Sequence, residues 1–222
     1  MRMGGELSAA TLAAIGIALS PLPFVVALAL VGPDGLVARA TAFVAGEALA
    51  VGAVCAAAVF ALQSDEADAG AVPRPIALLE VAIGCVLALM LVAHLKVGRR
   101  TGPPRWQMFI DGVGAGTAFA VGAAMILVNP KNLVLALAGA TAILQLGFST
   151  GGQVAGVATF TVASVSVLAA LLLLARAFPT PARSVIGRVR TFIVDHERVL
   201  VAVLLGALTA FFLVRGAVDT AI

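Results

Sequence analysis

Six long apolar segments dominate the sequence and determine its fold class. Each has about 20 or more residues with few charges, the length that an α-helix needs to cross the hydrocarbon core of a bilayer. The segments cover approximately residues 8–31, 38–62, 75–95, 110–140, 151–177 and 199–218. The chain is 62% hydrophobic and 11% charged, whereas soluble domains have about 25% charged residues. The sequence therefore predicts an all-α integral membrane protein with six transmembrane helices.

The loop cations predict the orientation of these helices. If the N-terminus lies outside, ten Lys and Arg residues fall in inner segments and three in outer segments. Because cytoplasmic loops are enriched in Lys and Arg, we expect both termini outside. The same asymmetry accounts for the net charge of +3, so no nucleic-acid partner is expected.

Four consecutive residues, Asn129-Pro130-Lys131-Asn132, do not suit the apolar segment that contains them. Pro130 lacks a backbone donor and clashes with the preceding helical turn. Lys131 places a cation in the membrane, at about 2.5–3.5 kcal/mol on insertion scales. The amides of Asn129 and Asn132 can hydrogen-bond freed backbone groups or a ligand. We interpret this stretch as a functional site.

A second proline element, Ser20-Pro21-Leu22-Pro23, lies in the first apolar segment. It aligns without gaps with the element at residues 129–132, and each is followed by an apolar run. A unit of three helices crosses the membrane an odd number of times, so a second copy is inverted relative to the first. In transporters with inverted repeats, interrupted helices meet near the midplane and form the binding site. A passive bundle with two proline kinks is the alternative.

The repeat predicts how the single membrane domain, residues 1–222, is organised. The first repeat covers about residues 8–95 and the second about residues 110–218, and helices 1 and 4 are the broken ones. A basic inner loop, residues 96–109, joins the two repeats.

Two charged residues are predicted to lie deep in the membrane, Glu47 and Lys131. Opposite charges attract strongly where the dielectric constant is low, so we expect the two side chains to face one cavity. In one hypothesis Glu47 exchanges a proton and Lys131 is a fixed cation, which would couple transport to protons. In the other hypothesis Lys131 binds an anionic group of the substrate.

Residues 179–198 combine apolar residues at helical spacing with a basic face. We expect an amphipathic helix on the inner leaflet, where its arginines contact anionic lipid headgroups. An ordinary positively charged loop is the alternative. The basic residues are Arg183, Arg188 and Arg190.

Glycines in the fourth and fifth segments predict close helix packing. Gly112, Gly114 and Gly116 form one small-residue ladder, and Gly152 and Gly156 form a GxxxG motif. Such ladders can join helices within one chain or between two copies, so a homodimer is one expected assembly.

No catalytic or cofactor motif stands out. Cys55 and Cys85 have no CxxC spacing and are expected to be packing residues. His94 and His196 lie at predicted membrane edges, and no phosphate-binding GxxxxGK[ST] motif occurs. We therefore expect no enzyme activity, metal or cofactor.

The two proline elements, the six helices and the basic middle loops resemble the GAP family of actinobacterial glycolipid-addressing membrane proteins. This family includes the sulfolipid-addressing protein and lies within the LysE exporter superfamily. NPK is found across LysE-type exporters, whereas SPLP followed by NPKN points to the GAP branch. The resemblance implies site residues Ser20, Pro21, Pro23, Asn129, Pro130, Lys131 and Asn132; Glu47 rests on the charge argument alone.

The resemblance implies transport of a cell-envelope glycolipid or other amphipathic lipid across the bacterial inner (plasma) membrane. One alternative is a LysE-type exporter of amino acids or small cations. Another is a membrane scaffold that docks a cytosolic lipid-synthesis enzyme through its basic loops.

Overall fold

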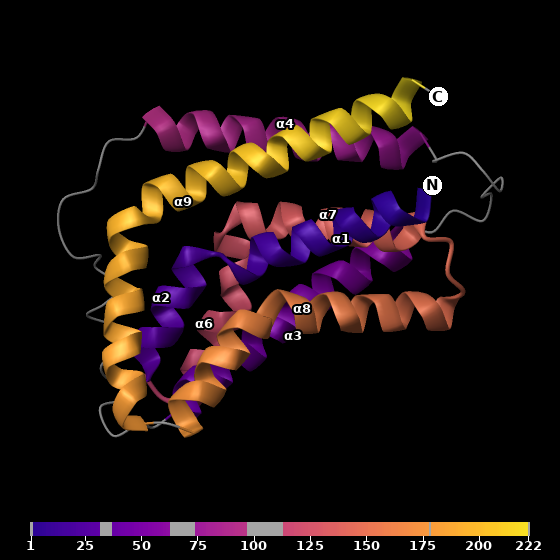
Figure 1. Cartoon of the computed structure of the whole chain (residues 1–222). Coiled ribbons are helices and arrows are strands. Elements are labelled where there is room, and N and C mark those ends of the chain that lie inside the picture. The colour runs from indigo at the N-terminus through magenta and orange to yellow at the C-terminus, as the bar shows by residue number, and fades with distance from the viewer. Residues whose placement is uncertain (1, 32–36, 63–73, 97–112, 178, 222) are drawn as a thin grey trace.

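The structure is a computed structural model, and it describes residues 2–31, 37–62, 74–96, 113–177 and 179–221. The described residues are almost entirely helical, as predicted, and contain no strand. The helices are α1 (Arg2–Ala18), α2 (Pro21–Leu30), α3 (Ala38–Ala61), α4 (Arg74–Lys96), α6 (Ala115–Val128), α7 (Pro130–Gln145), α8 (Thr150–Ala177) and α9 (Pro179–Ala221) (Figure 1).

Both proline elements break a helix, as the sequence predicts. The α1/α2 pair is bent by 44° and the α6/α7 pair by 77°. Pro21 and Pro130 each begin the second half-helix, where a missing N–H costs nothing and the fixed φ suits the helix. Ser20 and Asn129 precede the prolines with ψ angles of 117° and 88°, because proline disfavours helical backbone in the residue before it.

Two described helices, α3 and α8, are long and apolar enough to cross a membrane alone. The number rises to four if each bent pair forms one span. The predicted spans at residues 75–95 and 199–218 fall in α4 and α9, which contain shorter apolar stretches, Val81–Lys96 and Arg198–Val214. The protein is therefore a membrane protein with two to four candidate spans by length and composition.

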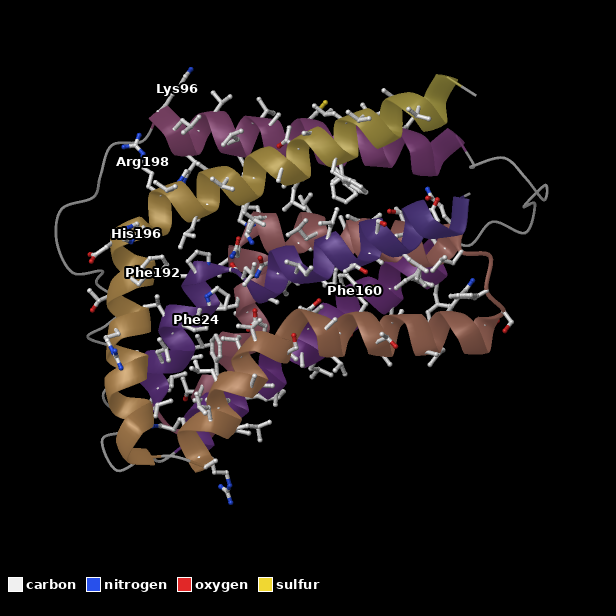
Figure 2. All side chains as sticks on the ribbon, viewed as in Figure 1. Phe24, Lys96, Phe160, Phe192, His196 and Arg198 are labelled. Carbon is white, nitrogen blue, oxygen red and sulfur yellow. The ribbon has the colours of Figure 1, made fainter. Side chains whose placement is uncertain are left out.

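Helix α9 is continuous from Pro179 to Ala221. The predicted surface segment, residues 179–198, is its first part and is not separated from the apolar part by a helix end. The path of α9 turns near His196 and Arg198, and its last part lies beside α4 (Figures 1 and 2). The beginning of α1 and the end of α9 lie at the same end of the molecule.

Buried side chains form two main hydrophobic cores. The first core joins α1, α4, α7, the second half of α3 and the last part of α9, with Leu87, Leu135 and Phe212 among its fully buried members. The second core joins α2, α6, the first half of α3 and the second half of α8, around Phe24 and Phe43. The α1/α2 pair, α3 and α8 contribute residues to both cores, so each of them crosses the boundary between the two cores.

Candidate functional site

The two proline elements are in direct contact, although they are 109 residues apart in the chain. Asn129 Nδ2 donates a hydrogen bond of 3.1 Å to Ser20 Oγ. Ser20 is 2% exposed, and the contact is partly buried. The structure therefore brings together the two helix breaks that the sequence predicted to form one site.

Lys131 compensates for the break between α1 and α2. In an unbroken helix the Gly16 carbonyl would accept a hydrogen bond from the Ser20 N–H, four residues later. The Ser20 N–H instead donates to Ile17 O at 2.9 Å. Lys131 Nζ donates to the freed Gly16 O at 2.6 Å, and Lys131 is buried. A cation from the second proline element thus satisfies a backbone group that the first element leaves free.

Glu47 lies on α3 and is 2% exposed. The side chains of Glu47 and Lys131 interact through their opposite charges. Oε2 of Glu47 nevertheless has no hydrogen-bond partner among the described residues. The predicted pair is therefore an electrostatic interaction, and Lys131 donates its hydrogen bond to Gly16 O.

Asn132 is the least satisfied polar residue of the site. It is 1% exposed, and both its Nδ2 and its Oδ1 have no partner among the described residues. Leaving a buried polar group unpaired costs about 1–3 kcal/mol. Unpaired groups in native structures therefore call for an explanation, such as a ligand, an ion or water. Asn132 and Glu47 Oε2 provide acceptors and a donor that a bound molecule could use.

Buried polar residues mark the boundary between the two hydrophobic cores. Three polar residues are buried where the chain passes from one core to the other. They are Ser20 between α1 and α2, Glu47 in α3 and Ser164 in α8. The hydroxyl of Ser164 donates a hydrogen bond of 2.8 Å to Phe160 O, one turn earlier in the same helix. The candidate site is thus a polar layer between two apolar regions.

A glycine-mediated crossing of α3 and α6 holds Glu47 in place. A methyl group added at Gly46 would overlap the carbonyl of Phe119, and one added at Gly122 would overlap the carbonyl of Phe43. The two backbones therefore touch directly, and the Glu47 N–H lies beside Gly122. Because Gly46 precedes Glu47, the crossing fixes the position of the carboxylate.

Sequence reasoning missed this crossing, although the repeated spacing Phe-x-x-Gly in α3 and α6 could have shown it. The glycine ladder that the sequence predicted to pack against another helix takes no part in this crossing. Gly112 is outside the described residues, and a side chain at Gly114 or Gly116 would meet open space. In the GxxxG motif, Gly156 packs against Ile143 within the chain, which is an intramolecular contact.

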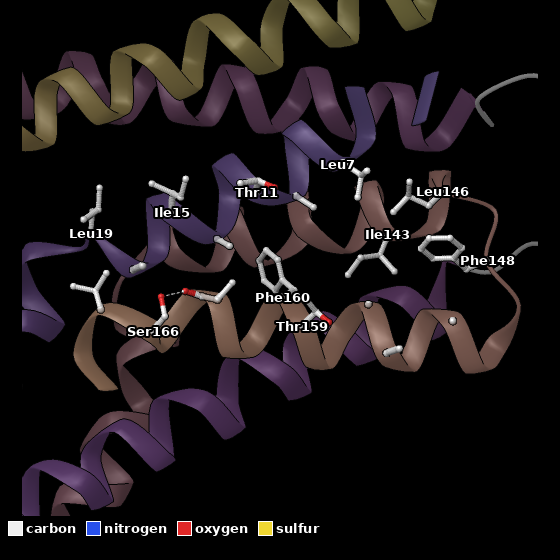
Figure 3. Close-up of a pocket in the computed structure, with 18 residues that line it drawn as sticks. Leu7, Thr11, Ile15, Leu19, Ile143, Leu146, Phe148, Thr159, Phe160 and Ser166 are labelled. Atoms are coloured by element: carbon white, nitrogen blue, oxygen red, sulfur yellow. Dashed lines mark hydrogen bonds between the residues drawn. The ribbon is translucent and has the colours of Figure 1, made fainter. Parts of the chain in front are cut away.

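A cavity of about 690 Å³ lies between α1 and α8, with the end of α7 at its floor (Figure 3). Its walls are mostly apolar, and Phe160 lies inside it. We call this cavity the α1/α8 groove. Neither Glu47 nor Lys131 lines it, so it is not the shared cavity that the charges predicted. The groove and the polar site share α1, since Gly16 lies between the lining residues Ile15 and Ala18.

The other residues singled out in the sequence make none of the contacts described above. Pro21 and Pro23 are buried in α2, which begins directly after Ser20. Arg188 is exposed on α9, and the side chains of Arg183 and Arg190 are outside the described part of the structure. Cys55 is buried in the first core, as expected for a packing residue, whereas Cys85 is exposed.

The two histidines lie at the contact between α4 and α9 or close to it. His94 Nε2 donates to Arg198 O at 3.1 Å, and Arg198 Nη2 donates to Leu95 O at 2.7 Å. His196 stacks on Phe192, with ring centroids 4.5 Å apart. No cluster of three metal-ligating residues occurs among the described residues.

Comparison with known proteins identifies the family. No curated protein and no solved structure matches the chain. The family model described as Sap, sulfolipid-1-addressing protein, matches residues 11–218, a range that contains both proline elements, Glu47 and all the contacts described above. The match covers nearly the whole chain and agrees with the resemblance seen in the proline elements. The chain therefore belongs to the sulfolipid-1-addressing protein family.

Proposed function

We propose that this protein transports an amphipathic lipid of the cell envelope, with a glycolipid as the favoured substrate class, across the bacterial inner membrane. The site is the polar layer where the two broken helices meet. One observation carries the proposal: the proline elements contact each other directly, and the buried atoms around them have unused hydrogen-bonding capacity. The family description, which refers to addressing of a sulfolipid, supports a lipid substrate.

The architecture that goes with this proposal is six spans in two inverted repeats. In it, α1/α2 corresponds to α6/α7, α3 to α8, and α4 to α9. Three features support the correspondence: both first members break directly before a proline, α3 packs against α8, and α4 packs against α9. The two chain ends on one side of the molecule agree with an even number of spans. The positive charges favour N-out and C-out.

The unpaired atoms suggest how the site acts during transport. Asn132 and Glu47 can bind hydroxyl groups of a sugar headgroup, since an amide both donates and accepts and a carboxylate accepts. Lys131 can bind an anionic group if it releases Gly16 O, and that release would loosen the contact between α1 and α7. Proton exchange at Glu47 would change the charge balance with Lys131 and thereby couple the two events.

One observation favours a second candidate function. Lys131 is 4% exposed and does not line the α1/α8 groove. Tight packing around Lys131 is expected if the protein is a membrane scaffold for a cytosolic lipid-synthesis enzyme and Lys131 binds no substrate. A LysE-type exporter of amino acids or small cations would instead need an enclosed polar cavity at Lys131.

The test compares surface-exposed and total envelope lipids in a strain that lacks the protein. The strain is complemented with the wild-type chain, with Lys131→Ala or with Gly116→Ala, a control in which the added methyl group meets open space. Lipid transport predicts that one lipid class is lost from the surface but retained in total in the deletion and Lys131→Ala strains. The Gly116→Ala strain should match the wild type.

Two outcomes would contradict lipid transport. A fall in total lipid together with surface lipid would indicate a synthesis scaffold. Unchanged surface lipids with altered sensitivity to external amino acids would indicate a LysE-type exporter. Membrane levels of each variant are measured in parallel by immunoblot, so that loss of protein is distinguished from loss of function.

A further inference from the structure

We propose that the α1/α8 groove binds one acyl chain of a membrane lipid. This inference deepens the proposed function and rests on it, since it identifies where the apolar part of an amphipathic substrate is held. It starts from the location of the groove, between α1 of a bent span and α8, which is long and apolar enough to span alone.

The chemistry of the walls selects hydrocarbon as the occupant. No charged residue is among the described residues that line the groove, and its polar side chains are three hydroxyls, those of Thr11, Thr159 and Ser166. Ser166 Oγ already donates to Ala163 O at 2.7 Å. A headgroup would find few partners here, whereas apolar side chains contact an acyl chain without losing hydrogen bonds.

The length of the groove matches one leaflet of a bilayer. The lining residues on α1 extend from Leu7 to Leu19, a rise of about 18 Å at 1.5 Å per residue. Half of the hydrocarbon core measures about 15 Å. The groove ends at Leu19, directly before Ser20 and the break between α1 and α2. An acyl chain along α1 would therefore reach from the surface to the level of the polar site.

The rim of the groove favours a hydrocarbon chain over a helix of a second copy. Large apolar side chains stand uncovered at this rim, with Leu7 53% and Leu19 54% exposed. A flexible chain can enter between such side chains and cover them, whereas a rigid helix could rest on the rim only.

Local structure keeps the groove open. Gly147 has φ of 65°, a conformation that glycine adopts without strain, and it reverses the chain between α7 and α8. Phe148 follows at the end of the groove. Deeper in the groove, Phe160 packs over Gly139, where any side chain would overlap its ring. Gly139 thus leaves the space that the ring of Phe160 occupies, and Ile143 lines the groove from α7.

The test measures lipid retained by the purified protein. The wild type, Ala163→Trp, Ala155→Trp and Ala158→Trp are reconstituted in vesicles of dioleoyl phosphatidylcholine, re-extracted in detergent and weighed by native mass spectrometry. Ala155 and Ala163 line the groove, whereas Ala158 is exposed on α8 outside it. All three substitutions place the same indole on one helix, so they differ chiefly in position.

We expect one retained lipid per wild-type and Ala158→Trp chain, and at least tenfold less on both groove variants. Equal retention by all four proteins would overturn the proposal. A loss of dimer mass in the groove variants, with lipid retention unchanged, would also overturn it and would assign the groove to an interface between copies. Circular dichroism checks that each variant is folded, and the two groove positions serve as independent replicates.

The groove proposal and the proposed function fail in different measurements. Retention is measured on purified protein with a phospholipid, whereas transport is measured on envelope lipids in cells. Normal surface lipids in the deletion strain would refute transport, whatever the purified protein retains. Unchanged retention in the groove variants would refute the groove, whatever the deletion strain shows.

Discussion

The interaction between Glu47 and Lys131 gives the most demanding prediction for stability. In Lys131→Met the hydrocarbon part of the side chain is approximately kept, but the Glu47 charge loses its counter-charge and Gly16 O loses its hydrogen-bond donor. Leaving the buried Gly16 carbonyl without a donor costs about 1–3 kcal/mol, and loss of the charge interaction with Glu47 adds to this cost. We therefore expect Lys131→Met to lower the free energy of unfolding by at least about 1–3 kcal/mol.

The double variant Glu47→Gln/Lys131→Met should recover part of that loss. With both charges removed, the unpaired Gly16 carbonyl is the main remaining defect, at about 1–3 kcal/mol. The double variant should consequently be more stable than the sum of the single variants predicts, by about 0.5–3 kcal/mol, the range found for residues that interact. Residues that do not interact give effects that add within about 0.3–0.5 kcal/mol.

Equilibrium unfolding in mixed micelles of dodecyl maltoside and dodecyl sulfate, followed by circular dichroism, measures these differences. The four proteins of the cycle are compared at one pH and one ionic strength. Effects of the two substitutions that add within 0.5 kcal/mol would refute the interaction between Glu47 and Lys131. A Lys131→Met protein as stable as the wild type would refute the role of Lys131 in satisfying Gly16 O.

Three further predictions concern packing and unpaired groups. Gly122→Ala should destabilise the protein by about 1–3 kcal/mol, because the added methyl group overlaps a backbone carbonyl. The control Gly116→Ala should not destabilise it. Equal effects of the two substitutions in the same unfolding assay would contradict the close crossing of α3 and α6. Asn132→Leu should stabilise the protein by removing unpaired buried atoms but abolish surface lipid delivery; wild-type delivery would show that Asn132 has no role in transport. Arg198→Ala should speed hydrogen exchange at the end of α4 by freeing Leu95 O, and unchanged exchange measured by mass spectrometry would show that this contact is unimportant.

The positions of the helix breaks could be predicted from sequence because proline acts locally. A missing N–H and a steric clash fix the end of a helix whatever the rest of the chain does. The contact between the two proline elements was also predictable, since their similarity indicated an inverted repeat. The partner of Lys131 was not, because a freed carbonyl leaves no mark in the sequence.

The glycines show where sequence reasoning fails. A ladder at Gly112, Gly114 and Gly116 has the composition of a packing face, but a glycine is needed only where another backbone approaches. That approach occurs at Gly46 and Gly122, which are isolated glycines in their helices. Which glycine meets a neighbouring backbone depends on the crossing point of two helices, and that is a tertiary property.

The α1/α8 groove was likewise invisible in the sequence. Its lining residues are apolar or small and resemble those of any membrane helix. The groove lies between α1 and α8 beside the end of α7, and neither helix carries a motif for that geometry. The lipid-headgroup contact predicted for residues 179–198 stays a prediction; of its three arginines, the structure describes the side chain of Arg188, which is exposed.

The measurement that tests the central claim most directly is disulfide formation between the two proline elements. Ser20→Cys and Asn129→Cys are introduced together in a chain with Cys55→Ala and Cys85→Ala, and native membranes are treated with copper phenanthroline. Because Ser20 Oγ and Asn129 Nδ2 are 3.1 Å apart, the account predicts rapid intramolecular cross-linking, detected as a shift in gel mobility that a reductant reverses. The matched pair Leu19→Cys/Asn129→Cys should cross-link slowly, since Leu19 faces the groove. No cross-link at positions 20 and 129, or equal rates for both pairs, would contradict the account.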